Sequence, residues 1–402
     1  MISYRKALKI MGQNIKVSTK TEIINIFKSH KRIISKNILA KTDSPRSNLS
    51  AMDGIVIFKT ELKKNNIFKI IGESKAGTKS SPSIKKGEAI FIYTGAPVPG
   101  LNKTIIPKEN YTFSEKDRLV RIKKIDNRDF IRFKGEDFKK NEICFSKNEI
   151  FKIRSLSLAK SMGVKTINVK KKPDIYVIIT GDELITKNNP EGLIQSSNEI
   201  FIKMLIEKFG GNLKGTFTAK DNEKDFLSKF NNLKNYDLLI TSGGISKGKY
   251  DIVKKVLKKN KLQILFDQVA VKPGKPTTFG KIGSSSYFLG LPGNPVSCFT
   301  SMLFYFSKFI NFYYGINFIS LKEKKMRLSH SVKKNNNLTN FLRVGFKDNA
   351  KKIFVYDNQD SSMQRILKDS DGIWIRKPKE KAKKKNDFCN ILALNNSFTE
   401  EI

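Results

Sequence analysis

Residues 171–318 alternate continuous apolar runs with segments of helical periodicity, and this rhythm constrains the fold more than any other feature of the chain. The runs IYVIIT (175–180), DLLIT (237–241) and YFLGL (287–291) lack the polar alternation of a half-exposed strand. Uninterrupted apolar strands separated by helices are typical of a parallel sheet that is covered on both faces. We therefore predict a doubly wound α/β domain over residues 171–318.

The sequence on either side of this domain is organised differently. Apolar residues spaced by three and four predict helices within residues 1–45 and again over 145–164, whereas residues 50–135 consist of short alternating segments typical of strands. A β-rich block between helical segments indicates that one domain is inserted into another. We expect three further parts: an extended helical linker domain (1–45 and 138–170), an inserted β-rich domain (46–137) and a C-terminal small β-barrel domain (319–402).

The net charge of +40 raises the question of a nucleic-acid partner, because clustered basic residues bind phosphate backbones. The lysines are, however, spread over nearly the whole length, and only residues 377–386 (KPKEKAKKKN) form a dense run. Spread lysines are typical of solvated faces, so we do not expect nucleic acid as a partner. A mobility shift with DNA that depends on salt would reverse this interpretation.

Cysteine and apolar patterning point to a cytoplasmic location. The three cysteines are isolated and only two histidines are present, which supports neither a disulfide framework nor a zinc site. The first residues lack the apolar core of a signal peptide, and no run approaches the roughly 18 residues of a membrane span. We expect a soluble cytoplasmic protein with no membrane partner.

The unusual residues of the α/β region follow its predicted strands, where an open parallel sheet binds its ligands. "TSGGISKG" (241–248) has two interpretations: a cradle whose glycines let backbone N–H groups approach a phosphate, or an ordinary tight turn between strand and helix. The motif alone favours neither. Its place after a buried strand favours binding.

Three carboxylates also follow predicted strands, at Glu183, Asp221 and Asp251. Each alone is best explained as a helix cap or a solvated group. Three carboxylates on one rim would nevertheless suit Mg²⁺, which binds carboxylates together with substrate phosphate oxygens.

Two proline-rich turns complete the predicted rim. "VKPGKP" (271–276) holds Lys272 and Lys275 in a rigid turn, which favours an anion clamp over two solvated lysines. In "LPGNPVSC" (291–298), Pro292 ends a strand and Pro295 suits the first position of a helix, so a plain strand-to-helix turn explains both. The same rigid loop would also present backbone amides to a ligand.

Together, these stretches resemble the molybdopterin molybdenumtransferase family, which includes bacterial MoeA and the E domain of gephyrin. The matching pieces occur in the family's order over residues 45–300: SAMDG, TGAPVP, IRFKGED, TGDEL, SGGIS, VKPGKP and GLPGNPVS. The resemblance implies an elongated homodimer with four domains. It implies that Mg²⁺ assists the reaction of molybdate with adenylylated molybdopterin, which releases AMP. Contact with a molybdopterin adenylyltransferase is a further expectation.

The resemblance also implies the roles of individual residues. Asp53, Glu183 and Asp251 match the catalytic acidic positions, and Glu183 and Asp251 would hold Mg²⁺. The resemblance and the strand-end loops together predict a set of substrate-binding residues. They are Thr94, Asp221, Ser242, Gly243, Gly244, Ser246, Lys272, Lys275, Pro292, Asn294, Pro295, Arg343 and Ser361.

The chain departs from the family pattern where Lys249 and Ser196 replace acidic residues, and a lysine run at 377–386 replaces the usual turn. Fewer carboxylates would weaken metal binding. Two alternatives therefore stay open: a molybdopterin adenylyltransferase, against which SAMDG and TGAPVP argue, and a molybdopterin-binding scaffold without catalysis.

Overall fold

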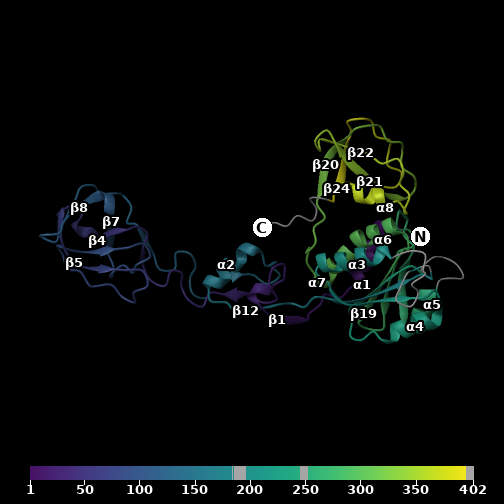
Figure 1. Ribbon diagram of the computed structural model, residues 1–402, viewed down its shortest axis with the longest axis horizontal. Helices are drawn as coiled ribbons and strands as arrows, with labels where there is room; N and C mark the ends of the chain where they lie inside the picture. The colour runs from purple at the N-terminus through teal and green to yellow at the C-terminus, as the bar shows by residue number, and fades with distance from the viewer. Residues whose placement is uncertain (183, 185–195, 245–251, 395–402) are drawn as a thin grey trace. The chain divides into compact units, whose positions relative to one another are not determined.

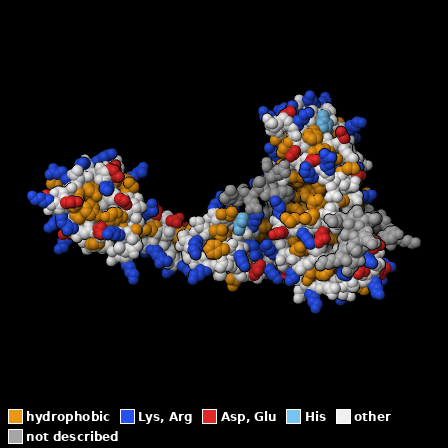
Figure 2. Space-filling view, viewed as in Figure 1, with side chains coloured by type: hydrophobic (Ala, Val, Ile, Leu, Met, Phe, Trp, Pro, Cys, Tyr) orange, Lys and Arg blue, Asp and Glu red, His pale blue; other side chains and the backbone are white. Residues whose placement is uncertain are grey.

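The computed structural model describes residues 1–182, 184, 196–244 and 252–394. The chain divides into two compact units, residues 1–23 with 169–402 and residues 24–168 (Figure 1). The four predicted domain boundaries remain a prediction. None of the helices in these described residues is long and apolar enough to cross a membrane. Lys and Arg side chains are spread over the visible face of each unit (Figure 2).

A six-stranded sheet forms the centre of the first unit. Its order is β14 (Asn212–Ala219), β13 (Asp174–Thr180), β15 (Leu238–Ser242), β19 (Ser286–Leu291), β18 (Thr278–Ile282) and β16 (Leu262–Asp267). The first four strands are parallel, as predicted. β18 runs antiparallel to β19, and β16 runs antiparallel to β18, so β16 has the same direction as the first four strands. The predicted parallel sheet therefore contains one antiparallel strand, β18, next to its edge. Only three residues join β18 to β19, which permits a hairpin and no helical crossover.

Helices cover both faces of this sheet, as predicted for a doubly wound domain. On one face, α4 (Glu223–Asn231) and α5 (Ile252–Lys259) bury Phe226, Val253 and Leu257 against Ile178 and Phe288. On the other, α3 (Ser197–Lys208) packs against α6 (Pro295–Ser301), which continues through a π-helical stretch (Met302–Phe306) into α7 (Ser307–Tyr314). The N-terminal helix α1 (Tyr4–Asn14) packs against α7.

The C-terminal part of the same unit is a closed five-stranded barrel, which confirms the predicted small β-barrel. Its strands pair in the order β21 (Thr339–Lys347), β22 (Lys352–Val355), β20 (Glu323–Leu328), β24 (Phe388–Ala393) and β23 (Gly372–Arg376), and β23 pairs back to β21. Apolar side chains such as Leu328, Trp374 and Ile391 fill it. The short strand β17 (Val271–Lys272) adds to β21, and the barrel also carries α8 (Gln364–Asp369).

The second unit is β-rich, as its alternating sequence predicts. Its six-stranded sheet has the order β7 (Lys103–Pro107), β4 (Gly54–Phe58), β6 (Glu88–Ile92), β5 (Ile67–Ser74), β9 (Leu119–Ile122) and β8 (Tyr111–Ser114). Successive side chains of β4 enter two apolar clusters, one on each side of the strand: Ile55 and Ile57 belong to one, and Val56 belongs to the other. Two short sheets pair β3 (Leu49–Ser50) with β10 (Ile131–Arg132) and β2 (Ile38–Leu39) with β11 (Ile143–Phe145).

The predicted helical linker domain is not confirmed. Residues 21–39 form β1 (Thr21–Asn25), a short 3₁₀ turn (Ile26–Lys28) and β2, and β1 pairs with β12 (Thr166–Lys170). The helix predicted over 145–164 is limited to α2 (Ile153–Ser161). Isoleucines spaced by three and four suit a helix, but β-branched side chains favour strands, and β1 shows the alternating exposure of a strand.

Candidate functional site

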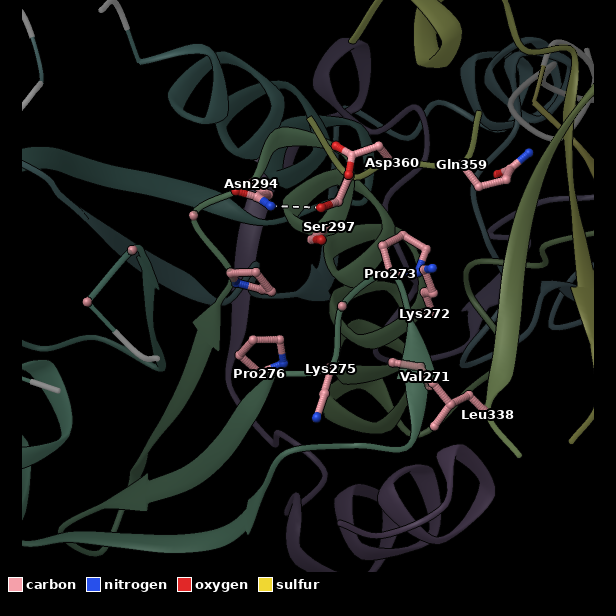
Figure 3. A pocket seen from close by; sticks show the side chains of 16 residues that line it. Val271, Lys272, Pro273, Lys275, Pro276, Asn294, Ser297, Leu338, Gln359 and Asp360 are labelled. Atoms are coloured by element: carbon pink, nitrogen blue, oxygen red, sulfur yellow. Dashed lines mark hydrogen bonds between the residues drawn. The ribbon is translucent and has the colours of Figure 1, made fainter. Parts of the chain in front are cut away.

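A pocket of about 530 Å³ lies at the carboxyl edge of the α/β sheet, where three strand-end loops meet two segments of the barrel, Leu338 and residues 359–361 (Figure 3). It is entirely within the first unit. Seven of the predicted site residues line it: Gly243, Gly244, Lys272, Lys275, Pro292, Asn294 and Ser361. Segments that are more than 100 residues apart in the sequence thus contribute to one cavity.

The glycine pair after β15 is required by a close approach of two backbones. Gly243 and Gly244 have φ angles of +88° and +61°, which side chains rarely adopt. A Cβ atom on Gly243 would lie 2.5 Å from the carbonyl oxygen of Thr180, and one on Gly244 would lie 2.8 Å from the Thr180 hydroxyl. Tight packing against β13 therefore explains both glycines, and the same turn faces the pocket.

The second wall is the loop between β19 and α6. Asn294 is the N-cap residue and Pro295 is the first residue of α6, as the sequence predicts. The side-chain amide of Asn294 donates a hydrogen bond to Ser361 Oγ (2.7 Å), and the backbone N–H of Val296 donates to the Ser361 carbonyl (3.1 Å) (Figure 3). This loop is therefore connected directly to the barrel.

The third wall carries the two predicted lysines. Lys272 and Lys275 are exposed on the loop 271–276, and neither ammonium group has an ion-pair partner in the described part of the chain. The hydroxyl of Thr277 holds this loop in place through contacts with the Gly274 carbonyl (2.7 Å) and with Ser301 Oγ (2.8 Å). Two ammonium groups on a fixed loop suit an anionic ligand.

The barrel contributes residues 359–361 to the pocket. Arg343, which is almost fully buried, lies beneath this segment and donates to Gln359 Oε1 and, at 3.4 Å each, to the carbonyls of Asn358 and Met363. Asp360 brings a negative charge into the cavity. Hydrogen bonds from Ser362, with a smaller contribution from the charges of Arg343 and Lys272, hold the pKa of Asp360 below its usual value. Arg343 thus supports the wall without lining it.

Other predicted site residues lie near the pocket or apart from it. Ser242 is buried below the glycine turn, and the backbone N–H of Asp221 donates to Asp182 Oδ1 (2.9 Å) at the ends of β14 and β13. Asp53 and Thr94 are paired in the second unit: the backbone N–H and the hydroxyl of Thr94 donate to Asp53 Oδ1 at 2.7 and 2.8 Å. These two hydrogen bonds lower the pKa of Asp53.

Three predicted residues, Glu183, Ser246 and Asp251, lie outside the described residues, as does Lys249. Within residues 1–182, 184, 196–244 and 252–394, no three acidic, cysteine or histidine side chains form a group that could hold a metal. Both predicted magnesium ligands, Glu183 and Asp251, lie outside the described residues, so the magnesium site stays a prediction.

Sequence reasoning missed several residues that line the pocket: Val271, Pro273, Gly274, Pro276, Gly293, Ser297, Leu338, Gln359 and Asp360. Most of them are sequence neighbours of predicted residues, so a prediction of whole loops rather than of single positions would have included them. Ser297 lies three residues after Asn294, in the first turn of α6, and helical periodicity could have identified it. Leu338 has no sequence signal.

Comparison with known proteins identifies relatives of both units. The model of the MoeA N-terminal region (domain I and II) matches residues 2–163, and the model of a probable molybdopterin binding domain matches residues 176–311. The molybdopterin molybdenumtransferase of Haemophilus influenzae is 32% identical over 300 residues, which cover 74% of each chain. That of Staphylococcus epidermidis is 32% identical over 354 residues, covering 85% of this chain and 83% of the other.

A solved structure has a similar fold. The crystal structure of a molybdopterin biosynthesis MoeA protein from Pyrococcus horikosii aligns over 100% of both chains with a TM-score of 0.83 and 24% sequence identity. This likeness concerns the fold alone.

Proposed function

The chain belongs to the MoeA family of molybdopterin molybdenumtransferases, enzymes of molybdenum cofactor biosynthesis, and from this premise we propose that it inserts molybdate into adenylylated molybdopterin with Mg²⁺-dependent release of AMP. The observation that carries the proposal is the single pocket lined by Gly243, Gly244, Lys272, Lys275 and the loop 292–294. Ammonium groups and backbone amides at a sheet's carboxyl edge suit a ligand with several negative charges.

Each group in the pocket has a defined task in this proposal. Lys272 and Lys275 bind the anionic substrates by charge-assisted hydrogen bonds, and the Gly243–Gly244 turn lets a phosphate approach the backbone. The barrel residue Ser361, held by Asn294, closes the pocket opposite the sheet. Hydrolysis of the phosphoanhydride then releases AMP while molybdate is held beside the dithiolene of molybdopterin.

We further propose that Glu183 and Asp251 hold Mg²⁺ and that Asp53 takes part in catalysis, as the family motifs imply. When bound, the ion would neutralise charge that develops on the phosphate oxygens. We also expect a homodimer, a contact with a molybdopterin adenylyltransferase and a cytoplasmic location.

The direct test supplies the purified protein with adenylylated molybdopterin, molybdate and Mg²⁺, and measures AMP release together with reconstitution of an apo-molybdoenzyme. We expect both products, each dependent on Mg²⁺. The Asp251→Asn variant should bind adenylylated molybdopterin but release no AMP. Cofactor synthesis without Mg²⁺ would contradict the role of the metal, and full activity of Asp251→Asn would contradict the role of that carboxylate.

A further inference from the structure

Asn198 lies in the first turn of α3 and connects two loops of the pocket without lining it. The residue is 7% exposed, and its amide nitrogen donates hydrogen bonds to Ser242 Oγ (2.9 Å) and to the Gly293 carbonyl (2.6 Å). The Ser242 hydroxyl lies 3.3 Å from the Pro292 carbonyl, to which it donates. A single buried amide thus joins the end of β15 to the loop that follows β19.

These two loops are neighbours whose separation sets one side of the pocket. Gly243 and Gly293 both line the cavity, and a Cβ atom on Gly293 would lie 3.8 Å from the Gly243 Cα. The backbone N–H of Gly243 also donates to the Leu291 carbonyl (3.2 Å). Both acceptors must lie within hydrogen-bond distance of the same Asn198 nitrogen. This requirement limits the separation of the two loops.

Burial of Asn198 has a cost in stability, which a residue with only a structural role would not need to impose. Its Oδ1 atom is buried and has no hydrogen-bond partner among the residues that the structure describes. A buried polar atom without a partner destabilises a protein, because it loses its hydrogen bonds to water and gains none in return. An amide is nevertheless well suited to this place, since its nitrogen offers two donors to two acceptors on different loops.

We propose that Asn198 is a positioning residue that fixes the Gly243–Gly244 turn and the loop 292–294 at the separation required for the phosphate groups of the substrate. The nature of this substrate rests on the function proposed above. Asn198 touches no substrate in this proposal and acts only through its two loops.

The Asn198→Asp variant tests this proposal, because it keeps the shape of the side chain and removes both N–H donors. In the full-length protein, we expect backbone amides in peptides covering 240–244 and 290–294 to exchange with deuterium at least tenfold faster. The KM for adenylylated molybdopterin should rise about tenfold, the factor that corresponds to roughly 1.4 kcal/mol, while kcat changes less than about twofold.

Asn311→Asp is the matched control. Asn311 is equally buried, and its amide also donates to two acceptors, Asn317 Oδ1 (3.0 Å) and the Ile319 carbonyl (2.9 Å), neither of which lines the pocket. It should lower the melting temperature to a similar extent, without the change in KM or in the exchange of the two loops. Equal effects of both variants on KM and exchange would overturn the proposal, as would unchanged loops in Asn198→Asp.

Ser242→Ala provides a second test if Asn198→Asp does not fold. It removes one acceptor of Asn198, and we expect a smaller increase in exchange at both loops. An increase confined to residues 240–244 would contradict the connection between them. Hydrogen exchange is measured without substrate, so the positioning role of Asn198 can be tested even if the wild-type protein releases no AMP. Absence of AMP release would refute the proposed function but not the role of Asn198.

Discussion

Asn294 and Ser361 form a side-chain hydrogen bond of 2.7 Å that joins the carboxyl edge of the α/β sheet to the C-terminal barrel. The two residues are 67 positions apart and both line the pocket. A second hydrogen bond, from the Val296 N–H to the Ser361 carbonyl, holds the same segment (3.1 Å). The barrel is therefore a fixed wall of the pocket.

A double-mutant cycle with Asn294→Ala and Ser361→Ala measures this connection. We expect each variant to lower the free energy of unfolding, and the pair to show a coupling of about 0.5–1.5 kcal/mol, the usual net contribution of one hydrogen bond. Urea denaturation of the four proteins gives the value. Strictly additive losses would show that the contact contributes nothing.

Replacing Gly243 by Ala should destabilise the protein far more than replacing a glycine in open space. A Cβ at Gly243 would lie 2.5 Å from the Thr180 carbonyl, in addition to the strain of a φ of +88°. Gly283→Ala is the control, since Gly283 has a φ of +59° but no heavy atom within 4 Å. Left-handed strain alone costs roughly 1–2 kcal/mol. In thermal unfolding, the melting temperature of Gly243→Ala should therefore be clearly lower than that of Gly283→Ala.

The sequence identified the pocket loops because each combines a buried strand with glycine or proline at its end. The rule that parallel strands present these ends at one edge then predicts that Gly243, Lys272 and Pro292 lie together. The family resemblance indicated Ser361 in the barrel, but Gln359 and Asp360 beside it were missed, because no local pattern tells how much of a barrel loop contacts the sheet.

The failures have equally specific causes. Ile23 and Ile24 match a helical spacing by accident, and pairing with β12, which is distant in the sequence, makes their segment a strand. The antiparallel strand β18 also depends on tertiary context, since the sequence of a strand does not reveal its direction.

Loss of either lysine of the pocket should weaken the binding of the anionic substrate. We expect Lys272→Met and Lys275→Met to raise the dissociation constant for adenylylated molybdopterin by about ten- to a hundredfold, the range of a lost charge-assisted hydrogen bond. Lys281→Met is the control, because Lys281 contacts Asn14 Oδ1 (3.2 Å) and does not line the pocket. Equal effects of all three variants in titration calorimetry would indicate a general effect of charge.

Asp360→Asn should have the opposite effect. The carboxylate of Asp360 lies in the pocket and interacts with the charge of Lys272, so it opposes an anionic ligand. Its removal should tighten the binding of molybdate severalfold at low ionic strength, and the gain should decrease as salt screens the charges. Weaker binding in the variant would instead mean that Asp360 contacts the ligand directly.

Thr94→Val tests the pairing of Asp53 and Thr94 through the pH dependence of stability. The Thr94 N–H and hydroxyl stabilise the ionised form of Asp53 and lower its pKa. A group whose pKa is lower in the folded state stabilises the fold above its unfolded pKa, which is about 3.9 for Asp, and this contribution is lost as the pH falls through the folded value. Thr94→Val keeps the backbone donor but removes the hydroxyl, so part of the contribution remains.

We therefore expect the wild-type protein to exceed Thr94→Val in free energy of unfolding by a constant amount near pH 7, and the difference to shrink as the pH falls below about 4. Urea denaturation at pH 7 and at pH 3 measures this difference in the free energy of unfolding. Thr78→Val is the control, because the exposed Thr78 hydroxyl donates to the Lys75 carbonyl (2.8 Å), which does not titrate. A difference for Thr94→Val that stays constant from pH 7 to pH 3, like that of the control, would show that the Thr94 hydroxyl does not act on the charge of Asp53.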